Sequence, residues 1–360
     1  MSAGPTPTHL RDPDQALLRV EDLVVDFATR HGVVQAVAGV SLDVLPGETV
    51  GLVGESGCGK STLGRTILRL HEPRSGSIRF AGADVTHMRR GDLRRVRRQL
   101  QMIFQDPISS LNPRRRVRDI VAEPLRIGSP GLGASEVRDA VDSMLEAVGL
   151  DPAVAADRYP HQFSGGQCQR ICIARALMLR PKLVICDEPV SALDVSVQAQ
   201  VLNLLEDLKA RFGLALLFVS HDLGVVKVVS DRVAVMYLGR LCETGTPDTL
   251  FDRPAHPYTA ALLESVPVPD PERRRDRSHR VTGDLPSPLD PPSGCRFRTR
   301  CDRATDLCRT EEPPMRAVGP DQHVACHHPL VGADPTDTGP TTATAPGPTA
   351  TPVPIGTERS

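Results

Sequence analysis

The sequence predicts an α/β fold, in which helices wrap a parallel sheet and antiparallel strands precede that sheet. Three short apolar runs, at residues 48–54, 182–189 and 214–222, each end in glycine or in charged or polar residues. Such runs are typical of buried strands, and strand, helix and strand in this order indicate parallel pairing with helical crossovers. Residues 17–44 instead alternate apolar and polar side chains, which predicts antiparallel strands.

The segments between these strands have helical spacing of their apolar residues. Residues 61–70 follow the first apolar run, and a long helix pattern separates the second run from the third. The stretch 89–179 is charged and helix-patterned, most clearly at residues 139–150. After Leu250 prolines and arginines become more frequent, and the tail from about residue 331 has a composition that cannot bury a core.

Composition excludes several classes of protein. Hydrophobic residues make up 40% and charged residues 24% of the 360 positions, as in soluble globular proteins. The net charge of −1 provides no positive field for nucleic acid. No apolar stretch approaches the roughly 18–20 residues that a membrane span needs, and the first residues lack the apolar region of a secretory signal. We therefore expect a cytosolic chain that reaches a membrane only through partners.

The segment GESGCGKS, from Gly54 to Ser61, fits the phosphate-loop pattern G-x-x-x-x-G-K-[ST] and lies between a predicted strand and a predicted helix. Glycines in this loop let successive N–H groups converge on phosphates. We expect Lys60 to bridge the β- and γ-phosphates and the Ser61 hydroxyl to ligate Mg²⁺. A simple glycine-rich turn is the alternative, which the strand and helix on either side disfavour. The predicted ATP-binding residues here are Gly54, Glu55, Ser56, Gly57, Cys58, Gly59, Lys60, Ser61 and Thr62.

The sequence LVICDE places Asp187 and Glu188 at the C-terminal end of a buried run, where ligands of parallel sheets bind. We expect Asp187 to hold Mg²⁺ and Glu188 to act as the general base that orients the attacking water. An ordinary strand end followed by a turn has the same appearance, so this assignment depends on the phosphate loop upstream.

The segment FSGGQ places Ser164, Gly165, Gly166 and Gln167 at the start of a predicted helix. A serine and two glycines at a helix start offer free N–H groups and a hydroxyl to an anion, although a plain helix N-cap is the alternative. One phosphate loop and one such turn in a single chain suggest a dimer in which the two elements face each other.

The SGGQ turn together with a downstream SALD and SHD resembles the ATP-binding-cassette (ABC) ATPases, and the resemblance runs from about residue 17 to 266. It implies a P-loop NTPase core with an antiparallel β-subdomain and an inserted helical subdomain. It also implies a head-to-tail dimer, with ATP held between the phosphate loop of one subunit and the Ser164–Gln167 turn of the other.

The same resemblance implies further site residues. Gln105 in MIFQDP would touch Mg²⁺ and the attacking water, and His221 in FVSHD would lie near the γ-phosphate. Ser191 to Asp194 would cross the dimer. Phe27 is similar to the aromatic residue that stacks on adenine, and a core phenylalanine is its alternative.

The resemblance divides the chain into four parts. They are a disordered N-terminus at 1–16, an ABC ATPase domain at 17–250 with its helical subdomain at about 95–178, a small C-terminal extension at 251–330, and a disordered tail at 331–360.

Three stretches closely resemble the ATPases of oligopeptide and dipeptide importers: residues 51–65, 105–117 and 256–271. The resemblance implies an ATPase that powers peptide import from the cytoplasmic face of the membrane. Its partners would be a second ABC ATPase subunit, identical or different, two transmembrane permease subunits and, indirectly, an extracytoplasmic solute-binding protein. The alternatives are the ATPase of an importer for nickel or another small solute, and a soluble ABC protein without transport function.

In such ATPases the helical insert after Gln105 receives the coupling helices of the membrane subunits. Four arginines there are expected either to rim a partner groove or to face solvent: Arg114, Arg115, Arg116 and Arg118.

Four cysteines fall in the extension with the spacing C-x5-C-x6-C-x17-C: Cys295, Cys301, Cys308 and Cys326. A proline-rich segment with little core of its own needs a staple, and four thiolates can supply one. Some peptide-importer ATPases with this extension carry a [4Fe–4S] cluster, which four cysteines suit. Zn²⁺ is the alternative, although its usual close C-x2-C pairs are missing, and cysteines without metal are a third reading.

Overall fold

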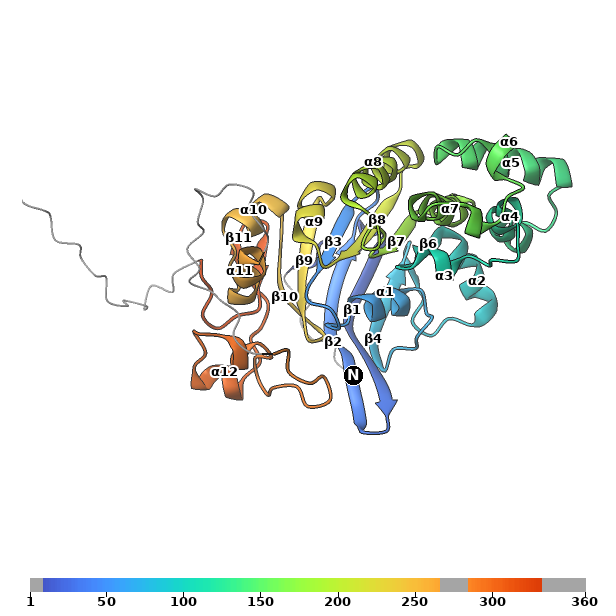
Figure 1. Ribbon diagram of the computed structural model, residues 1–360. Coiled ribbons are helices and arrows are strands. Elements are labelled where there is room, and N and C mark those ends of the chain that lie inside the picture. Colours follow the sequence, from blue (N-terminus) through green and yellow to red (C-terminus); the bar gives the residue numbers. More distant parts are fainter. Residues whose placement is uncertain (1–8, 266–283, 332–360) are drawn as a thin grey trace, which may run out of the picture.

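The alternating stretch near the N-terminus forms the antiparallel sheet that its pattern predicts. β1 (Leu18–Thr29) lies between β2 (Gly32–Val44) and β4 (Ser75–Phe80), and the short β5 (Ala83–Asp84) follows β4. Figure 1 shows the computed structural model, which describes residues 9–265 and 284–331.

The second sheet contains the apolar runs and has the strand order β11-β12-β10-β9-β3-β8-β7-β6. Its central strands pair in parallel, from β9 through β3, β8 and β7 to β6, while β10, β12 and β11 add antiparallel pairs at the other edge. The bounds are β3 (Thr49–Val53), β6 (Leu100–Ile103), β7 (Leu183–Asp187), β8 (Ala215–Ser220), β9 (Arg232–Tyr237), β10 (Arg240–Gly245), β11 (Arg316–Gly319) and β12 (Gln322–Val324).

Helices surround this sheet, and α3 to α7 gather at one end of the molecule (Figure 1). Within residues 9–265 and 284–331, no helix is both long and apolar enough to cross a membrane. The helices are α1 (Lys60–Ile67), α2 (Arg90–Gln99), α3 (Pro107–Ser110), α4 (Val117–Gly128), α5 (Ala134–Ala147), α6 (Pro152–Ala155), α7 (Gly165–Leu177), α8 (Val195–Phe212), α9 (Leu223–Val229), α10 (Pro247–Asp252), α11 (Pro257–Glu264) and α12 (Asp306–Thr310).

The main sheet has an apolar core on each face. Val184 and Cys186 of β7 pack into the cluster that contains the buried side chains of α4, α7 and α8. Their neighbours Leu183 and Ile185 pack into a second cluster with α1 and the antiparallel sheet. Because successive strand residues point to opposite faces, β7 must be apolar throughout, which explains its unbroken hydrophobic run.

The charged stretch 89–179 is not helical throughout. Its residues Leu100–Ile103 form β6, which pairs in parallel with β7 at the edge of the main sheet. The four-residue run LQMI is too short to stand out among charged neighbours, and its strand conformation depends on pairing with a segment about 80 residues away. A strand of the main sheet therefore interrupts this stretch before α3 to α7.

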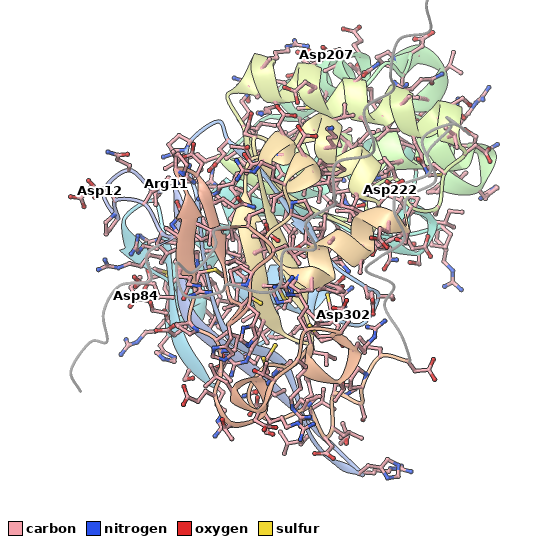
Figure 2. The ribbon with its side chains drawn as sticks, turned by 90° about the vertical axis from the view of Figure 1, so that its left-hand side faces the viewer. Arg11, Asp12, Asp84, Asp207, Asp222 and Asp302 are labelled. Atoms are coloured by element: carbon pink, nitrogen blue, oxygen red, sulfur yellow. The ribbon has the colours of Figure 1, made fainter. Side chains whose placement is uncertain are left out.

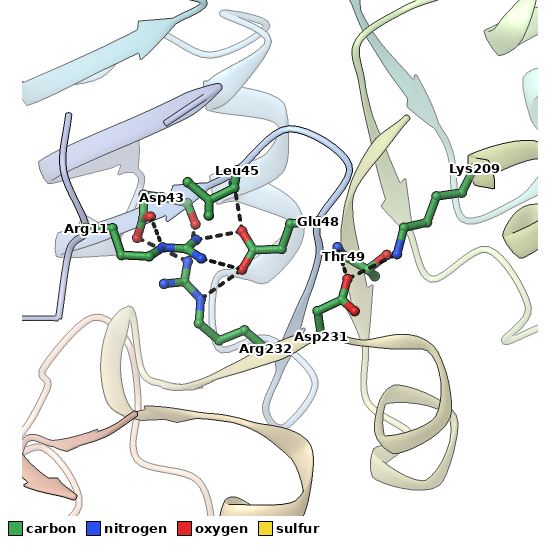
Figure 3. Close-up of polar contacts among 8 residues, drawn as sticks. All are labelled: Arg11, Asp43, Leu45, Glu48, Thr49, Lys209, Asp231 and Arg232. Carbon is green, nitrogen blue, oxygen red and sulfur yellow. Dashed lines mark hydrogen bonds and ion pairs between the residues drawn. The ribbon is translucent and has the colours of Figure 1, made fainter. Parts of the chain in front are cut away.

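The expected disorder of residues 1–16 is wrong for residues 9–16. Arg11 pairs with Asp43 at 2.7 Å and with Glu48 at 2.6 Å, and Arg232 of β9 contacts the same two carboxylates (Figure 3). The Nε2 of His9 also lies 2.7 Å from the Ser41 carbonyl oxygen. These partners are 32 or more residues away, so local composition gives no sign of them. The expected disorder of residues 1–8 and 332–360 lies outside the described residues.

The C-terminal extension packs on the outer edge of the main sheet. Its β12 pairs with β10 and β11 pairs with β12, so these two strands extend the sheet that contains β3, the strand before the phosphate loop. In Figure 2, Asp207 marks α8 and Asp302 marks the extension. The extension lies below α8 in that view.

Candidate functional site

The phosphate loop lies between β3 and α1, as its motif requires. A Cβ atom on Gly54 would lie 2.1 Å from the Met236 carbonyl oxygen, and one on Gly59 would lie 2.1 Å from the Ala36 carbonyl oxygen, so neighbouring backbone forbids any side chain at either position. The Nζ of Lys60 donates to the carbonyl oxygens of Gly54, at 2.7 Å, and Glu55, at 3.0 Å. The loop is therefore wrapped around a buried ammonium group, as expected for a cradle that receives anionic phosphates.

Asp187 and Ser61 meet at the end of this loop. The Ser61 hydroxyl donates to Asp187 Oδ1 at 2.6 Å, and the Arg65 guanidinium lies 3.5 Å from Oδ2. The Asp187 side chain is fully buried, and burial raises its pKa although Ser61 and Arg65 act in the opposite direction. A hydroxyl and a carboxylate beside the phosphate loop form the hard oxygen donor set that Mg²⁺ prefers, so these residues fit the predicted ion.

The Glu188 carboxylate contacts both of the other predicted catalytic residues. Gln105 Nε2 donates to Glu188 Oε2 at 2.9 Å, and His221 Nδ1 lies 3.2 Å from Oε1. The three residues directly follow or closely follow β6, β7 and β8, which are adjacent parallel strands. Their carboxyl ends meet at one edge of the sheet, where α/β proteins bind ligands. Glu188 has a positive φ of 48°, a conformation that non-glycine residues rarely adopt and that concentrates at functional sites.

The Ser164–Gln167 turn caps α7. The Ser164 hydroxyl accepts from the Gln167 N–H at 3.3 Å, and the Gln167 side chain accepts from the Ser164 N–H at 3.0 Å. A Cβ on Gly166 would lie 2.5 Å from Val197 of α8, which explains glycine there. Both the N-cap and the anion-binding readings remain compatible with this geometry. Ser164, Gln167 and Asp194 are exposed, so the turn and the start of α8 are open to a second molecule.

The comparisons with known proteins agree with this site. The family model described as ABC transporter matches residues 37–191, and the model described as oligopeptide/dipeptide transporter, C-terminal region, matches residues 242–308. The oligopeptide transport ATP-binding protein OppF of Salmonella typhimurium is 52% identical over 311 residues, which cover 84% of this chain and 93% of that protein. This chain belongs to the ABC transporter ATP-binding family.

Other relatives agree with this assignment. OppF of Escherichia coli K12 is 51% identical over 311 residues, with the same coverage of 84% and 93%. Among solved structures, the dimeric post-hydrolysis state of the cassette MJ0796 bound to ADP and Pi is 27% identical, with a TM-score of 0.59 over 64% of this chain and 98% of that one. CbiO1 from Clostridium perfringens, part of the CbiONQ transporter complex, is 29% identical with a TM-score of 0.59, over 66% and 92% of the two chains.

Phe27 of this ABC cassette lies on β1, half-buried against the core shared by α1 and the antiparallel sheet. Its ring meets the His71 ring edge-on, with centroids 5.2 Å apart. The adenine assignment of Phe27 stays a prediction.

The arginines after Gln105 are mostly paired with acidic residues. Arg115 pairs with Glu123, whereas Arg116 and Arg118 both pair with Asp157. A groove of about 850 Å³ lies instead between α2 and α4, with Leu93 and Ile127 among its apolar residues. Its arginines are Arg69, Arg90, Arg94, Arg97, Arg98 and Arg175. The spacing of the α2 arginines places them on one helix face, which makes this groove strongly basic.

The four cysteines of the extension line one small cavity, beside His256, His327 and His328. All are free thiols, and burial raises the pKa of Cys301 to about 11 and that of Cys326 to about 12. Within residues 9–265 and 284–331, however, no group of three or more His, Cys, Asp or Glu side chains has the arrangement of a metal site. The thiols therefore suit a metal chemically, but their present arrangement does not form a closed set of ligands.

Three residues around the site were missed by sequence reasoning. Arg65 follows Ser61 by four residues, one helical turn, and this spacing on α1 is the signal that could have identified it. Tyr258 and Arg300 contact Glu55 from 203 and 245 residues further along the chain. No local pattern indicates a contact across such a separation.

Proposed function

We propose that this chain is the ATP-hydrolysing subunit of an ABC importer for di- and oligopeptides. The observation that carries the ATPase assignment is the Glu188 carboxylate held between Gln105 and His221, next to the Lys60 loop. The peptide assignment is supported by the match of residues 242–308 to the oligopeptide/dipeptide transporter region and by the OppF relatives. Neither a nickel importer nor a soluble non-transport ATPase is favoured by these matches.

Each residue of the site has a chemical role in hydrolysis. Lys60 exchanges its carbonyl partners for phosphate oxygens when ATP enters the loop. Ser61, Asp187 and Gln105 would hold Mg²⁺, which when bound neutralises charge on the phosphates. Glu188 orients a water and takes its proton as the water oxygen bonds to the γ-phosphorus and the bond to the β-phosphate oxygen breaks. His221 positions the Glu188 carboxylate for this step.

The phosphate loop is half of an ATP site. The Ser164–Gln167 turn and Asp194 are exposed on this chain, and they would complete the site of a second ABC ATPase subunit. This requires the head-to-tail dimer that the family resemblance implies, and the MJ0796 neighbour was solved as a dimer. Closing the dimer on ATP and reopening it after hydrolysis would drive the transporter.

The basic groove between α2 and α4 is our candidate for the surface that contacts the two transmembrane permease subunits. It combines arginines with exposed apolar side chains such as Ile127, a composition typical of partner surfaces. Docking there would hold the chain at the cytoplasmic face of the membrane, with the solute-binding protein acting only through the permease.

We also propose that residues 17–250 form the ATPase domain and residues 251–330 the importer-type extension.

We further propose that Cys295, Cys301, Cys308 and Cys326 hold a metal group, [4Fe–4S] or else Zn²⁺. Their common cavity supports this, and the ligand arrangement would have to close around the group. Anaerobic purification followed by a visible spectrum and metal analysis tests it. About four iron atoms per chain with a visible absorption band, or one zinc, would support the proposal. A metal-free chain would contradict it.

The transport function is tested by co-expressing the chain with its permease subunits, a second ATPase subunit and the binding protein in vesicles. ATP-dependent uptake of a labelled peptide, lost with Glu188→Gln, is the expected result. Uptake of nickel but not of peptides, or ATP hydrolysis that the membrane subunits and peptide leave unchanged, would contradict the proposal.

A further inference from the structure

The C-terminal extension makes a direct ion pair with the phosphate loop. Arg300 Nη1 lies 3.1 Å from Glu55 Oε1 and 2.9 Å from Glu55 Oε2. Only 9% of the Arg300 side chain and 25% of the Glu55 side chain are exposed, so the pair is shielded from solvent more than an ordinary surface pair. Glu55 is the second residue of the phosphate-loop motif, directly after Gly54.

Two tyrosines complete the support of Glu55. The Glu55 N–H donates to the hydroxyl of Tyr258, a fully buried residue of α11, at 2.9 Å. Arg300 lies 3.4 Å from the Tyr237 hydroxyl, and its guanidinium carbon is 5.8 Å from the centre of that ring. The Tyr237 and Tyr258 rings contact each other and Phe297 of the extension. The start of the loop therefore rests on an aromatic cluster that the extension completes.

The extension also supports the middle of the loop. Arg296 donates to the Leu238 carbonyl oxygen in the turn between β9 and β10. The next residue of that turn, Gly239, donates its N–H to the Cys58 carbonyl oxygen at 2.8 Å. Two positions of the loop, Glu55 and Cys58, are thus connected to residues 296–300 by short chains of contacts.

Charge makes the Arg300 contact important for a nucleotide site. ATP brings negative phosphates to the loop, and Glu55 contributes a carboxylate within that loop. The Arg300 guanidinium neutralises this carboxylate and holds it to one side. The Tyr258 hydroxyl accepts the hydrogen bond of the Glu55 N–H. Loss of Arg300 would leave an unpaired negative charge beside the phosphates and a less ordered loop.

We propose that Arg300 is a positioning residue of the ATP site: by pairing with Glu55 it orders and neutralises the phosphate loop, so that the C-terminal extension controls ATP affinity. This inference rests on the proposed function in one respect, namely that the loop binds ATP. Arg300 directly precedes Cys301, so the residue that contacts the loop is the chain neighbour of one that lines the cysteine cavity.

The test is ATP binding to Arg300→Ala, measured as the Kd for ATP by calorimetry on the full chain. We expect a Kd about tenfold higher than that of the wild type, a loss typical of a hydrogen bond to a charged group. The rate at saturating ATP should change by less than about threefold, because Glu188, Gln105 and His221 keep their contacts. Arg300→Lys, which keeps the charge, should recover part of the affinity.

Arg298→Ala is the matched control, since Arg298 belongs to the same short helical turn but its guanidinium donates to the carbonyl and hydroxyl oxygens of Ser293, away from Glu55. It should bind ATP like the wild type. The decisive variant is Arg300→Ala with Glu55→Gln, which removes the unpaired charge and should restore affinity toward the wild-type value.

Equal losses in Arg298→Ala and Arg300→Ala, or no recovery when Glu55→Gln is added, would overturn the proposal. These outcomes are distinct from a failure of the proposed function, in which the wild-type chain itself would not bind ATP.

Discussion

Arg11→Ala is expected to destabilise the chain much more than removal of an ordinary surface arginine. Arg11 joins the segment before β1 to two carboxylates, Asp43 and Glu48, at 2.7 and 2.6 Å (Figure 3). These carboxylates are 1% and 9% exposed, whereas Arg11 itself is 32% exposed. Glu48 directly precedes β3, the strand that leads to the phosphate loop, so the contact supports the site as well as the sheet.

The magnitude lies between two limits. Fully exposed pairs contribute about 0.2–1 kcal/mol, and removing one partner of a buried pair costs about 3–5 kcal/mol. After the substitution Arg232 still contacts Asp43 at 3.1 Å and Glu48 at 3.5 Å, so neither carboxylate is left without a cation. We therefore expect a loss of about 1–2 kcal/mol, seen as a fall of about 1.5–3 °C in the Tm of a chain of this size.

The assay is thermal unfolding at moderate ionic strength, with Arg126→Ala as control. Arg126 pairs with Asp119 at 3.0 Å, and the two side chains are 54% and 37% exposed. Its removal should cost less than about 0.5 kcal/mol. Equal shifts for the two variants would refute the reasoning, because burial of the carboxylates would then make no difference.

Two further predictions concern the loop and the extension. Lys60→Ala should weaken ATP binding by about tenfold to a hundredfold, measured by calorimetry, because it removes the ammonium group at the centre of the loop. An unchanged Kd would contradict the role of Lys60. Complete burial lowers the pKa of His256 to about 3, from 6.5 in the unfolded chain, so acid favours the unfolded state once the pH falls below 6.5. The free energy of unfolding should fall by about 2 kcal/mol between pH 8 and pH 5 through this residue, and denaturant unfolding of His256→Asn should lack that part of the pH dependence.

The sequence was most informative where function imposes a local pattern. The phosphate loop, Glu188 and the capping turn at Ser164 are short motifs, and β3, β7 and β8 were predicted because a strand covered on both faces must be apolar throughout. The convergence of Gln105 and His221 on Glu188 follows from the parallel order of β6, β7 and β8, of which the sequence pattern indicated β7 and β8 but not β6.

Long-range contacts were beyond the reach of sequence patterns. The contacts of Arg11 and Arg300 depend on partners 32 to 245 residues away, and β6 depends on its pairing with β7. Ion pairs of this kind have no periodicity, so only the folded chain reveals them. The four cysteines of the extension line one cavity, but whether they hold a metal depends on ligand geometry that their spacing does not specify.

ATP turnover by Glu188→Gln tests the central claim most directly. The substitution keeps an oxygen and the size of the side chain but removes the base that Gln105 and His221 hold in place. The account predicts that the Kd for ATP stays close to the wild-type value while phosphate release falls by about 10²–10⁴-fold. Hydrolysis at the wild-type rate would contradict the assignment of this chain's catalytic site.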